Sequence, residues 1–161
     1  MILYFVRHGI AEEYTAQQTD SDRNLTPEGV SDMKHVASCL AAFSIKPDAI
    51  IASPLARAFQ TAHIIAGGMQ NPSLITDRHL SSGNFSLGAL QKIVSEHRHA
   101  QEMMFVGHEP DMSRLVYELC GAQVQMKKGA VACIEAPRPE SGMGTLRWLM
   151  TPGILRHLKP H

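Results

Sequence analysis

The sequence contains few cysteines and no excess of charge of either sign. Its three cysteines, Cys39, Cys120 and Cys133, lie far apart in apolar surroundings. This spacing excludes a C-x-x-C site and predicts reduced, buried thiols in a reducing compartment. Lysine plus arginine and aspartate plus glutamate number 15 each. Because no net charge attracts nucleic acid or an acidic membrane surface, we expect neither as a partner.

Long apolar runs, internal repeats and low-complexity tracts are also missing. No apolar stretch approaches the length of a membrane span, and the N-terminus lacks the plan of a signal peptide. The 161 residues include 44% hydrophobic and 19% charged side chains, which is ordinary for a globular protein with a substantial core. We therefore expect one domain over residues 1–161, located in the cytoplasm.

What is present is a regular alternation of strand-like and helix-like segments. The expected strands cover residues 2–6, 48–52, 73–76 and 102–106, followed by residues 130–135 and 144–150 as an antiparallel hairpin. The expected helices cover residues 27–41, 55–66, 87–97 and 110–119. This alternation predicts an α/β fold, a three-layer α/β/α sandwich with a mixed, mostly parallel sheet of about six strands.

Two of these helices carry start signals. Thr26 is expected as an N-cap, with Pro27 at the first helical position and Glu28 in the first turn. Ser53 and Pro54 are expected to cap the helix over residues 55–66.

The triplet Arg7-His8-Gly9 directly follows the first apolar strand. Ligands bind at the carboxyl ends of strands in α/β sheets, so the triplet lies where a site is expected. An arginine holds phosphate oxygens in a planar fork, while an unprotonated imidazole can attack phosphorus. Gly9 lets backbone or ligand approach closely because it has no Cβ. The triplet therefore predicts a phosphoryl site.

Two other strands also end in polar side chains. Arg57 lies in the first turn of its helix, where the helix dipole disfavours a cation and a bound anion resolves the conflict. His108 follows the strand over residues 102–106. Taken singly, Arg57 is also consistent with a surface salt bridge, and a lone histidine beside a strand, such as His108, is more often a hydrogen-bonded structural residue. Together with Arg7 and His8 they can converge on one phosphate.

These residues resemble a known pattern. Arg7-His8-Gly9, the run over residues 53–62 and Gly107-His108 are similar to the signature of the histidine phosphatase (phosphoglycerate-mutase-like) superfamily. The short chain, residues 23–29 and residues 107–110 resemble its small SixA-type phosphohistidine phosphatase branch. The resemblance covers residues 1–120.

The resemblance implies a two-step transfer in which His8 becomes phosphohistidine and water then releases phosphate. It implies that Arg7, Arg57 and His108 hold the phosphoryl oxygens, with Gly9 in the same site. Arg23 is a further candidate for this site, and a solvated loop charge is the alternative. No cofactor and no metal ion are expected. The implied partner is a histidine-phosphorylated protein, such as a phosphorelay or phosphotransferase component.

One departure from the pattern bears on the substrate. Larger relatives place an acidic proton donor on an insertion between the second arginine and the second histidine, but here only 50 residues separate Arg57 from His108. Glu109 and Asp77 remain candidate donors, against ordinary roles at a helix start and in a loop. A missing acid fits a phosphoramidate better than an alkoxide leaving group. A small-molecule phosphomonoesterase and a non-catalytic phosphoprotein-binding module remain the alternatives.

Overall fold

A six-stranded mixed sheet forms the centre of the computed structural model, which describes residues 1–17, 19–69 and 72–158. The strands, in the order β3-β2-β4-β1-β5-β6, are β1 (Ile2–Arg7), β2 (Ala49–Ala52), β3 (Ser73–Thr76), β4 (Glu102–Gly107), β5 (Val131–Glu135) and β6 (Thr145–Met150). The first four strands in this order run parallel, and β5 runs antiparallel to β1 and β6. The predicted mixed, mostly parallel sheet and its final hairpin are confirmed.

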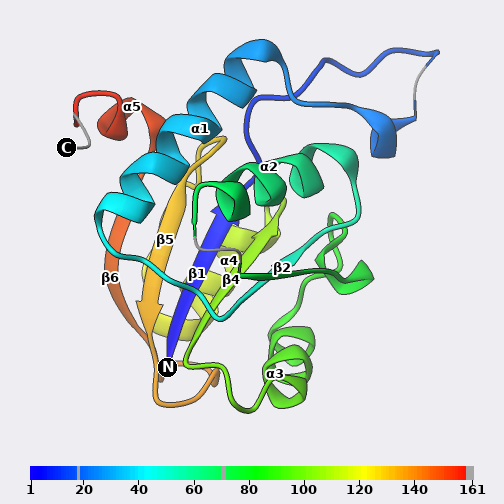
Figure 1. Ribbon diagram of the computed structural model, residues 1–161. Helices are drawn as coiled ribbons and strands as arrows, with labels where there is room; N and C mark the ends of the chain where they lie inside the picture. The colour runs from blue at the N-terminus through cyan, green and yellow to red at the C-terminus, as the bar shows by residue number, and fades with distance from the viewer. Residues whose placement is uncertain (18, 70–71, 159–161) are drawn as a thin grey trace.

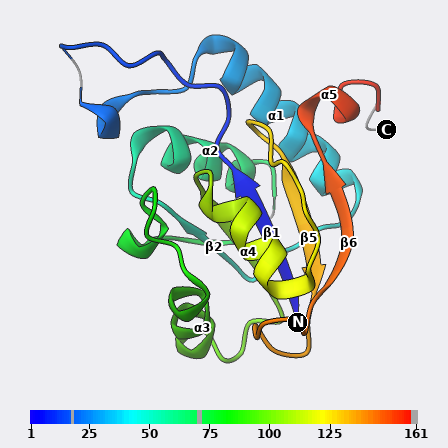
Figure 2. The same ribbon diagram turned by 180° about the vertical axis from the view of Figure 1, so that it is seen from behind.

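Helices cover both faces of the sheet, as the two opposite views show (Figure 1, Figure 2). One face carries α1 (Pro27–Ala42), α2 (Ala56–Gly67) and the short α5 (Pro152–Leu155); the other carries α3 (Leu87–Glu96) and α4 (Asp111–Cys120). Two 3-10 turns, η1 (Asp20–Asp22) and η2 (Arg78–Leu80), lie in loops. Sequence analysis did not predict α5 or the two turns. In the described part of the chain, no helix has the length and apolarity needed to cross a membrane.

The core consists of two apolar layers, one on each side of the sheet. Tyr4 and Val6 of β1 face α1 and α2, while Leu3 and Phe5 face α3 and α4. Because both faces are covered, β1 is an uninterrupted apolar run instead of an alternating one. Phe5 stacks on Phe105 of β4, with ring centroids 5.7 Å apart. This packing fixes the ends of the two strands, where the polar residues begin.

The two predicted helix caps have different outcomes. Thr26 caps α1, since its side chain accepts a hydrogen bond from the backbone N–H of Gly29 at 3.0 Å. The prediction for Ser53 is wrong, because α2 begins at Ala56 and its N-cap residue, Leu55, makes no side-chain cap. Ser53 lies two residues before this N-cap, and its hydroxyl accepts from the Leu55 amide at 3.3 Å.

Two glycines allow α1 to pack directly against the segment that follows β1. A Cβ on Gly29 would lie 2.1 Å from the carbonyl oxygen of Ile10, and one on Gly9 would lie 2.8 Å from Cγ of Met33. A methyl group fits at neither position. The close approach that Gly9 permits is therefore that of α1, which fixes the backbone next to His8.

The cysteines only partly match their predicted burial. Cys39 and Cys133 are buried, whereas Cys120 is partly exposed near the end of α4. All are free thiols. The Cys120 thiol donates to the carbonyl oxygen of Val116 at 3.1 Å, a contact that an α-helix offers to a side chain near its C-terminus.

Candidate active site

Three strand ends meet at one edge of the sheet. The register pairs Arg7 of β1 with Gly107 of β4, and Ala52 of β2 with Val106 of β4. The residues that follow therefore emerge side by side. The His8 amide donates to the Gly107 carbonyl at 3.0 Å. The rings of His8 and His108 lie 5.2 Å apart between centroids. The structure thus brings together the two histidines that sequence analysis placed at separate strand ends.

His8 is buried, and its ring has a defined proton position. Its Nδ1 lies 2.7 Å from the backbone carbonyl oxygen of Gly9. A carbonyl oxygen can only accept, so Nδ1 carries the proton and Nε2 carries the lone pair. Nε2 faces Arg57, whose Nε–H donates toward it at 3.3 Å. The nitrogen that could attack phosphorus thus points at a guanidinium.

The surroundings of His8 keep its ring neutral. Burial, followed by the neighbouring His108 and the positive charges of Arg57 and Arg7, lowers the pKa of His8 to about 3, although the Gly9 carbonyl favours the charged form. An imidazole with this pKa holds its lone pair throughout the neutral range. Such a group can serve as a nucleophile.

Arg57 is buried to 3% exposure at the start of α2, so the salt bridge of the alternative interpretation is present, but its guanidinium lies beneath the surface and only its partner Asp20 is half-exposed. Its Nη1 donates to the backbone oxygen of Asp20 at 2.6 Å, and its Nη2 donates to Asp20 Oδ2 at 2.9 Å. The first turn of α2 contains no acidic residue, so the balancing charge comes from η1. Sequence analysis did not identify Asp20.

His108 is almost completely buried and also lacks a charge. Its Nε2 lies 2.8 Å from Oγ of Ser53, the residue that follows β2. Burial and the charge of Arg57 lower the pKa of His108 to about 4, against the opposing effect of Asp20 and Asp111. Ser53 was expected to be a helix cap, and its contact with His108 is one that the sequence pattern did not indicate.

Arg7 is held by the loop that precedes β5. Its Nη1 donates to the carbonyl oxygen of Met126 at 2.9 Å, and the Gly129 amide donates to the backbone oxygen of Arg7 at 3.1 Å. The first bond holds the guanidinium, and the second holds the backbone at the end of β1.

Unpaired polar atoms gather at this edge of the sheet. Among the described residues, the buried side-chain nitrogen and oxygen atoms without a hydrogen-bond partner are Arg7 Nε, His108 Nδ1 and Glu109 Oε1. Buried polar groups are nearly always paired. Arg7 ends β1 and His108 follows the neighbouring strand β4, and their unpaired nitrogens suit an acceptor that is itself a ligand. An oxyanion supplies such acceptors.

Arg23 reaches the site only through another residue. Its Nε donates to Asp20 Oδ1 at 2.9 Å, and its Nη1 donates to the backbone oxygen of Glu12 at 2.9 Å. It is therefore a paired side chain and not the freely solvated charge of the alternative interpretation. A place for Arg23 on the substrate itself stays a prediction.

Both backbone polar groups of Gly9 form hydrogen bonds within the protein. Its amide donates to Oγ1 of Thr61 at 3.0 Å, and its carbonyl oxygen accepts from His8. Thr61 in turn donates to the backbone oxygen of Arg57 at 2.8 Å. Gly9 thus connects the strand end to α2, and its expected contact with substrate stays a prediction.

The two candidate proton donors differ in their surroundings. Asp77 accepts from the His79 amide at 2.8 Å and lies 2.7 Å from its ring; these contacts outweigh partial burial, and the pKa of Asp77 is lowered. For Glu109, burial raises the pKa, against the hydrogen bonds of Ser113 and the charge of Arg7. Asp77 is held ionised, while Glu109 is shifted toward its protonated form.

A buried carboxylate supports the start of α4. Asp111 is fully buried and accepts from the amides of Gly83 at 2.8 Å and Phe85 at 3.3 Å, and from Arg114 at 2.7 Å. It fastens the loop before α3 to the helix that follows His108. An acidic residue in the first turn of a helix can be recognised in a sequence. Its hydrogen bonds to the distant Gly83 and Phe85 amides cannot be predicted in this way.

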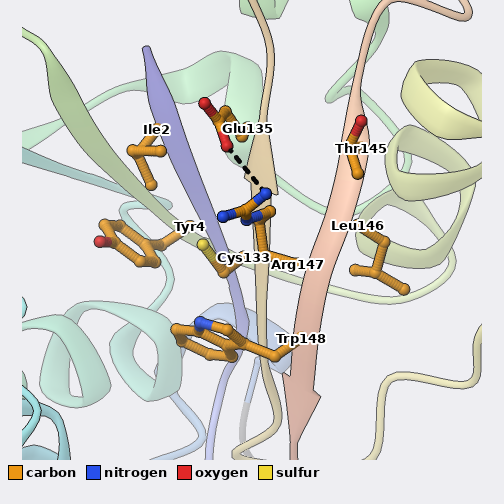
Figure 3. Close-up of a pocket in the computed structure, with 8 residues that line it drawn as sticks. All are labelled: Ile2, Tyr4, Cys133, Glu135, Thr145, Leu146, Arg147 and Trp148. Atoms are coloured by element: carbon orange, nitrogen blue, oxygen red, sulfur yellow. Dashed lines mark ion pairs between the residues drawn. The ribbon is translucent and has the colours of Figure 1, made fainter.

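A hollow of about 550 Å³ lies toward the opposite end of β1 (Figure 3). It is lined by Ile2, Tyr4, Cys133, Glu135, Thr145, Leu146, Arg147 and Trp148. Burial, and then the charge of Glu102, raises the pKa of Cys133 to about 11, so its thiol remains protonated. Arg147 is paired with Glu135 at 3.3 Å. This hollow therefore has no activated nucleophile, and the reactive groups lie at the other end of the sheet.

Guanidinium and imidazole groups, and no cluster of metal ligands, characterise the described part of the site. In residues 1–17, 19–69 and 72–158, no three His, Cys, Asp or Glu side chains lie together in a way that could hold a metal ion. Two arginines and two neutral imidazoles meet instead, a set suited to binding an oxyanion and to attack on its central atom.

Comparison with known proteins assigns the family. Residues 3–86 match the histidine phosphatase superfamily (branch 1). A protein of Picosynechococcus is 33% identical over 137 residues, 81% of this chain and 82% of its own. Phosphohistidine phosphatase SixA of Escherichia coli is 28% identical over 163 residues, 99% of each chain. The structure of the protein histidine phosphatase SixA with tungstate is 26% identical, has a TM-score of 0.84, and matches 95% of this chain and 98% of its own. The chain belongs to the histidine phosphatase superfamily (branch 1) and is a phosphatase of the SixA type.

Proposed function

We propose that this phosphatase removes the phosphoryl group from phosphohistidine on a protein, through a covalent intermediate on its own His8. The observation that carries the proposal is the neutral, buried His8, with its Nε2 lone pair directed at Arg57. The relative from Escherichia coli is a phosphohistidine phosphatase, and the similar solved structure holds tungstate, a tetrahedral oxyanion like phosphate. Both support the substrate class.

In the first step, His8 Nε2 attacks phosphorus, and a new N–P bond forms as the N–P bond of the substrate breaks. A substrate imidazole that is protonated on its other nitrogen leaves as neutral imidazole. It needs no further proton at that moment. In the second step, water attacks phosphorus, the bond to His8 breaks, and phosphate is released with the water's proton passing to solvent or product.

The contact between His8 and Gly9 assists the second step. Nδ1 keeps its proton, which it donates in a hydrogen bond to the Gly9 carbonyl oxygen. The phosphorylated ring therefore carries a positive charge. A positively charged ring departs as neutral imidazole when the N–P bond breaks. The same contact that directs the lone pair to Nε2 therefore also makes His8 a good leaving group.

The remaining groups stabilise the charge on the three equatorial oxygens. Arg7 Nε and His108 Nδ1 are buried donors without a partner, and Arg57 Nε already faces the reacting nitrogen. For His108, this role requires the proton on Nδ1, which a hydrogen bond from the Ser53 hydroxyl to Nε2 favours. A preorganised donor of this kind contributes roughly 2.7–4 kcal/mol to transition-state stabilisation.

The leaving group decides between this proposal and its main alternative, a small-molecule phosphomonoesterase. An alkoxide needs a proton from a general acid, which accelerates such reactions by roughly 10²- to 10⁴-fold. Asp77 is held ionised by His79 and is unsuited to that task. Glu109 favours the alternative, since burial raises its pKa and its Oε1 is unpaired. Against this, its hydrogen bonds with Ser113 are those of a helix-start residue.

Steady-state kinetics on three substrates test the proposal: a histidine-phosphorylated protein, phosphoramidate and an alkyl phosphate. We expect kcat/KM for the first two to exceed that for the alkyl phosphate by about 10² or more. His8→Asn, which preserves a donor to the Gly9 carbonyl, should abolish turnover of all three. Equal hydrolysis of the alkyl phosphate, lost selectively in Glu109→Gln, would establish the phosphomonoesterase instead. A non-catalytic binding module would show no turnover at all.

A further inference from the structure

Asp20 connects two arginines from outside the elements that carry the site. It lies in η1, in the segment between β1 and α1, which runs beside the start of α2 (Figure 1). Its Oδ2 accepts from Arg57 Nη2 at 2.9 Å, and its Oδ1 accepts from Arg23 Nε at 2.9 Å. Its backbone oxygen accepts from Arg57 Nη1 at 2.6 Å. One residue thus supplies three acceptors to two guanidinium groups.

The planar guanidinium of Arg57 has two edges that can bind a pair of acceptors. The terminal edge, formed by Nη1 and Nη2, is taken by the backbone oxygen and Oδ2 of Asp20. The side edge, formed by Nε and the second hydrogen of Nη2, is directed to the region of His8, because Nε lies 3.3 Å from His8 Nε2. Occupation of the first edge therefore fixes the direction of the second.

We propose that Asp20 is a positioning residue, which holds Arg57 so that its side edge meets the phosphoryl group as that group passes to His8. The inference rests on the proposed function, because it requires Arg57 to bind the phosphoryl oxygens. Arg23 then acts indirectly, because it binds Oδ1 of Asp20 while Arg57 binds Oδ2.

Asp20 is held by these charged contacts and not by burial. Its side chain is 51% exposed, whereas that of Arg57 is 4% exposed. Arg23 fixes it from the far side, with its Nη2 2.8 Å from Oδ1 and its Nη1 on the Glu12 carbonyl oxygen. The carboxylate also lies between two cations that would otherwise repel each other. The arrangement supplies both an orientation and a partial neutralisation of Arg57.

Orientation and neutralisation have opposite effects on an oxyanion. A negative charge beside the site weakens oxyanion binding, so its removal alone should tighten that binding. Loss of the correct Arg57 orientation should weaken it. The sign of the change in oxyanion affinity therefore reports which effect of Asp20 prevails, without any need for catalytic turnover.

The experiment is calorimetric titration of the full-length chain with inorganic orthophosphate and with tungstate. We expect Asp20→Asn to raise both dissociation constants about tenfold, which corresponds to about 1.4 kcal/mol. Asp22→Asn is the matched control, since it removes the same charge from the same turn, where Asp22 accepts from Thr19 and Ser21. It should leave both constants unchanged or slightly lower.

A double-mutant cycle shows whether Asp20 acts through Arg57. In an Arg57→Ala background, Asp20→Asn should have no further weakening effect. Tighter oxyanion binding by Asp20→Asn, or an undiminished loss in the Arg57→Ala background, would overturn the inference. These outcomes are distinguishable from failure of the proposed function, because they are measured on inorganic anions and not on phosphohistidine.

Discussion

Acidification should destabilise the fold through His8, because the folded protein keeps this ring neutral. Burial and the neighbouring cations lower its pKa from 6.5 to about 3 in the folded state. In the unfolded chain the ring binds a proton below about pH 6.5. The unfolded state thus binds more protons between these two values, so the contribution of His8 is complete above pH 6.5 and is lost as the pH falls toward 3.

The magnitude follows from this difference in pKa. Stability changes by about 1.4 kcal/mol per pH unit while one state is protonated and the other is not, over roughly 1.5 units between pH 6.5 and 5.0. His8 should therefore account for about 2 kcal/mol of the stability lost between pH 7.5 and 5.0. Any folded-state pKa below about 4 gives the same result.

Urea unfolding at pH 7.5 and 5.0 measures this contribution. The pH-induced loss in the free energy of unfolding should be about 2 kcal/mol smaller in His8→Asn than in the wild type. His99→Asn serves as the control, since it replaces an exposed imidazole outside the site. If wild type and His8→Asn lose equal stability, folding does not lower the pKa of His8, and the argument that its buried surroundings keep the ring neutral fails.

Other substitutions examine separate contacts of the site. Arg57→Lys keeps the charge but loses the two-edged fork, and kcat/KM for phosphoramidate should fall by about 10² or more. Ser53→Ala removes the hydrogen bond to His108 Nε2 and leaves that buried nitrogen unpaired, so it should lower kcat about tenfold and cost roughly 1–3 kcal/mol of stability. Asp111→Ala leaves the amides of Gly83 and Phe85 unpaired, and urea unfolding should show a loss of roughly 2–4 kcal/mol. Wild-type values in any of these assays would refute the corresponding contact's role.

Local patterns were sufficient to predict the architecture. The apolar runs of β1 and β4 and the turn-rich segment between β5 and β6 determine strand positions through properties of neighbouring residues. Thr26 and Pro27 likewise mark the start of α1 by contacts within one turn. The observed helix and strand boundaries differ from the predicted ones by at most one residue at each end, because these ends depend on tertiary contacts.

The convergence of His8, Arg57 and His108 was also predictable, because parallel strands present their carboxyl ends at one edge of a sheet. The partners of these residues were not. Asp20 lies 37 positions from Arg57, and Ser53 lies 55 positions from His108. Such pairs depend on how a loop folds over the sheet and leave no periodic trace in the sequence. Ser53 was misassigned for the same reason, since a serine before a helix usually indicates a cap.

Capture of the phosphorylated enzyme reveals whether His8 carries the phosphoryl group during turnover. The protein is mixed with phosphoramidate, quenched during turnover under alkaline conditions, digested and mapped by mass spectrometry. We expect a base-stable, acid-labile phosphate on His8, and none in His8→Asn. Phosphate on any other residue, or turnover that persists in His8→Asn, would contradict this role of His8.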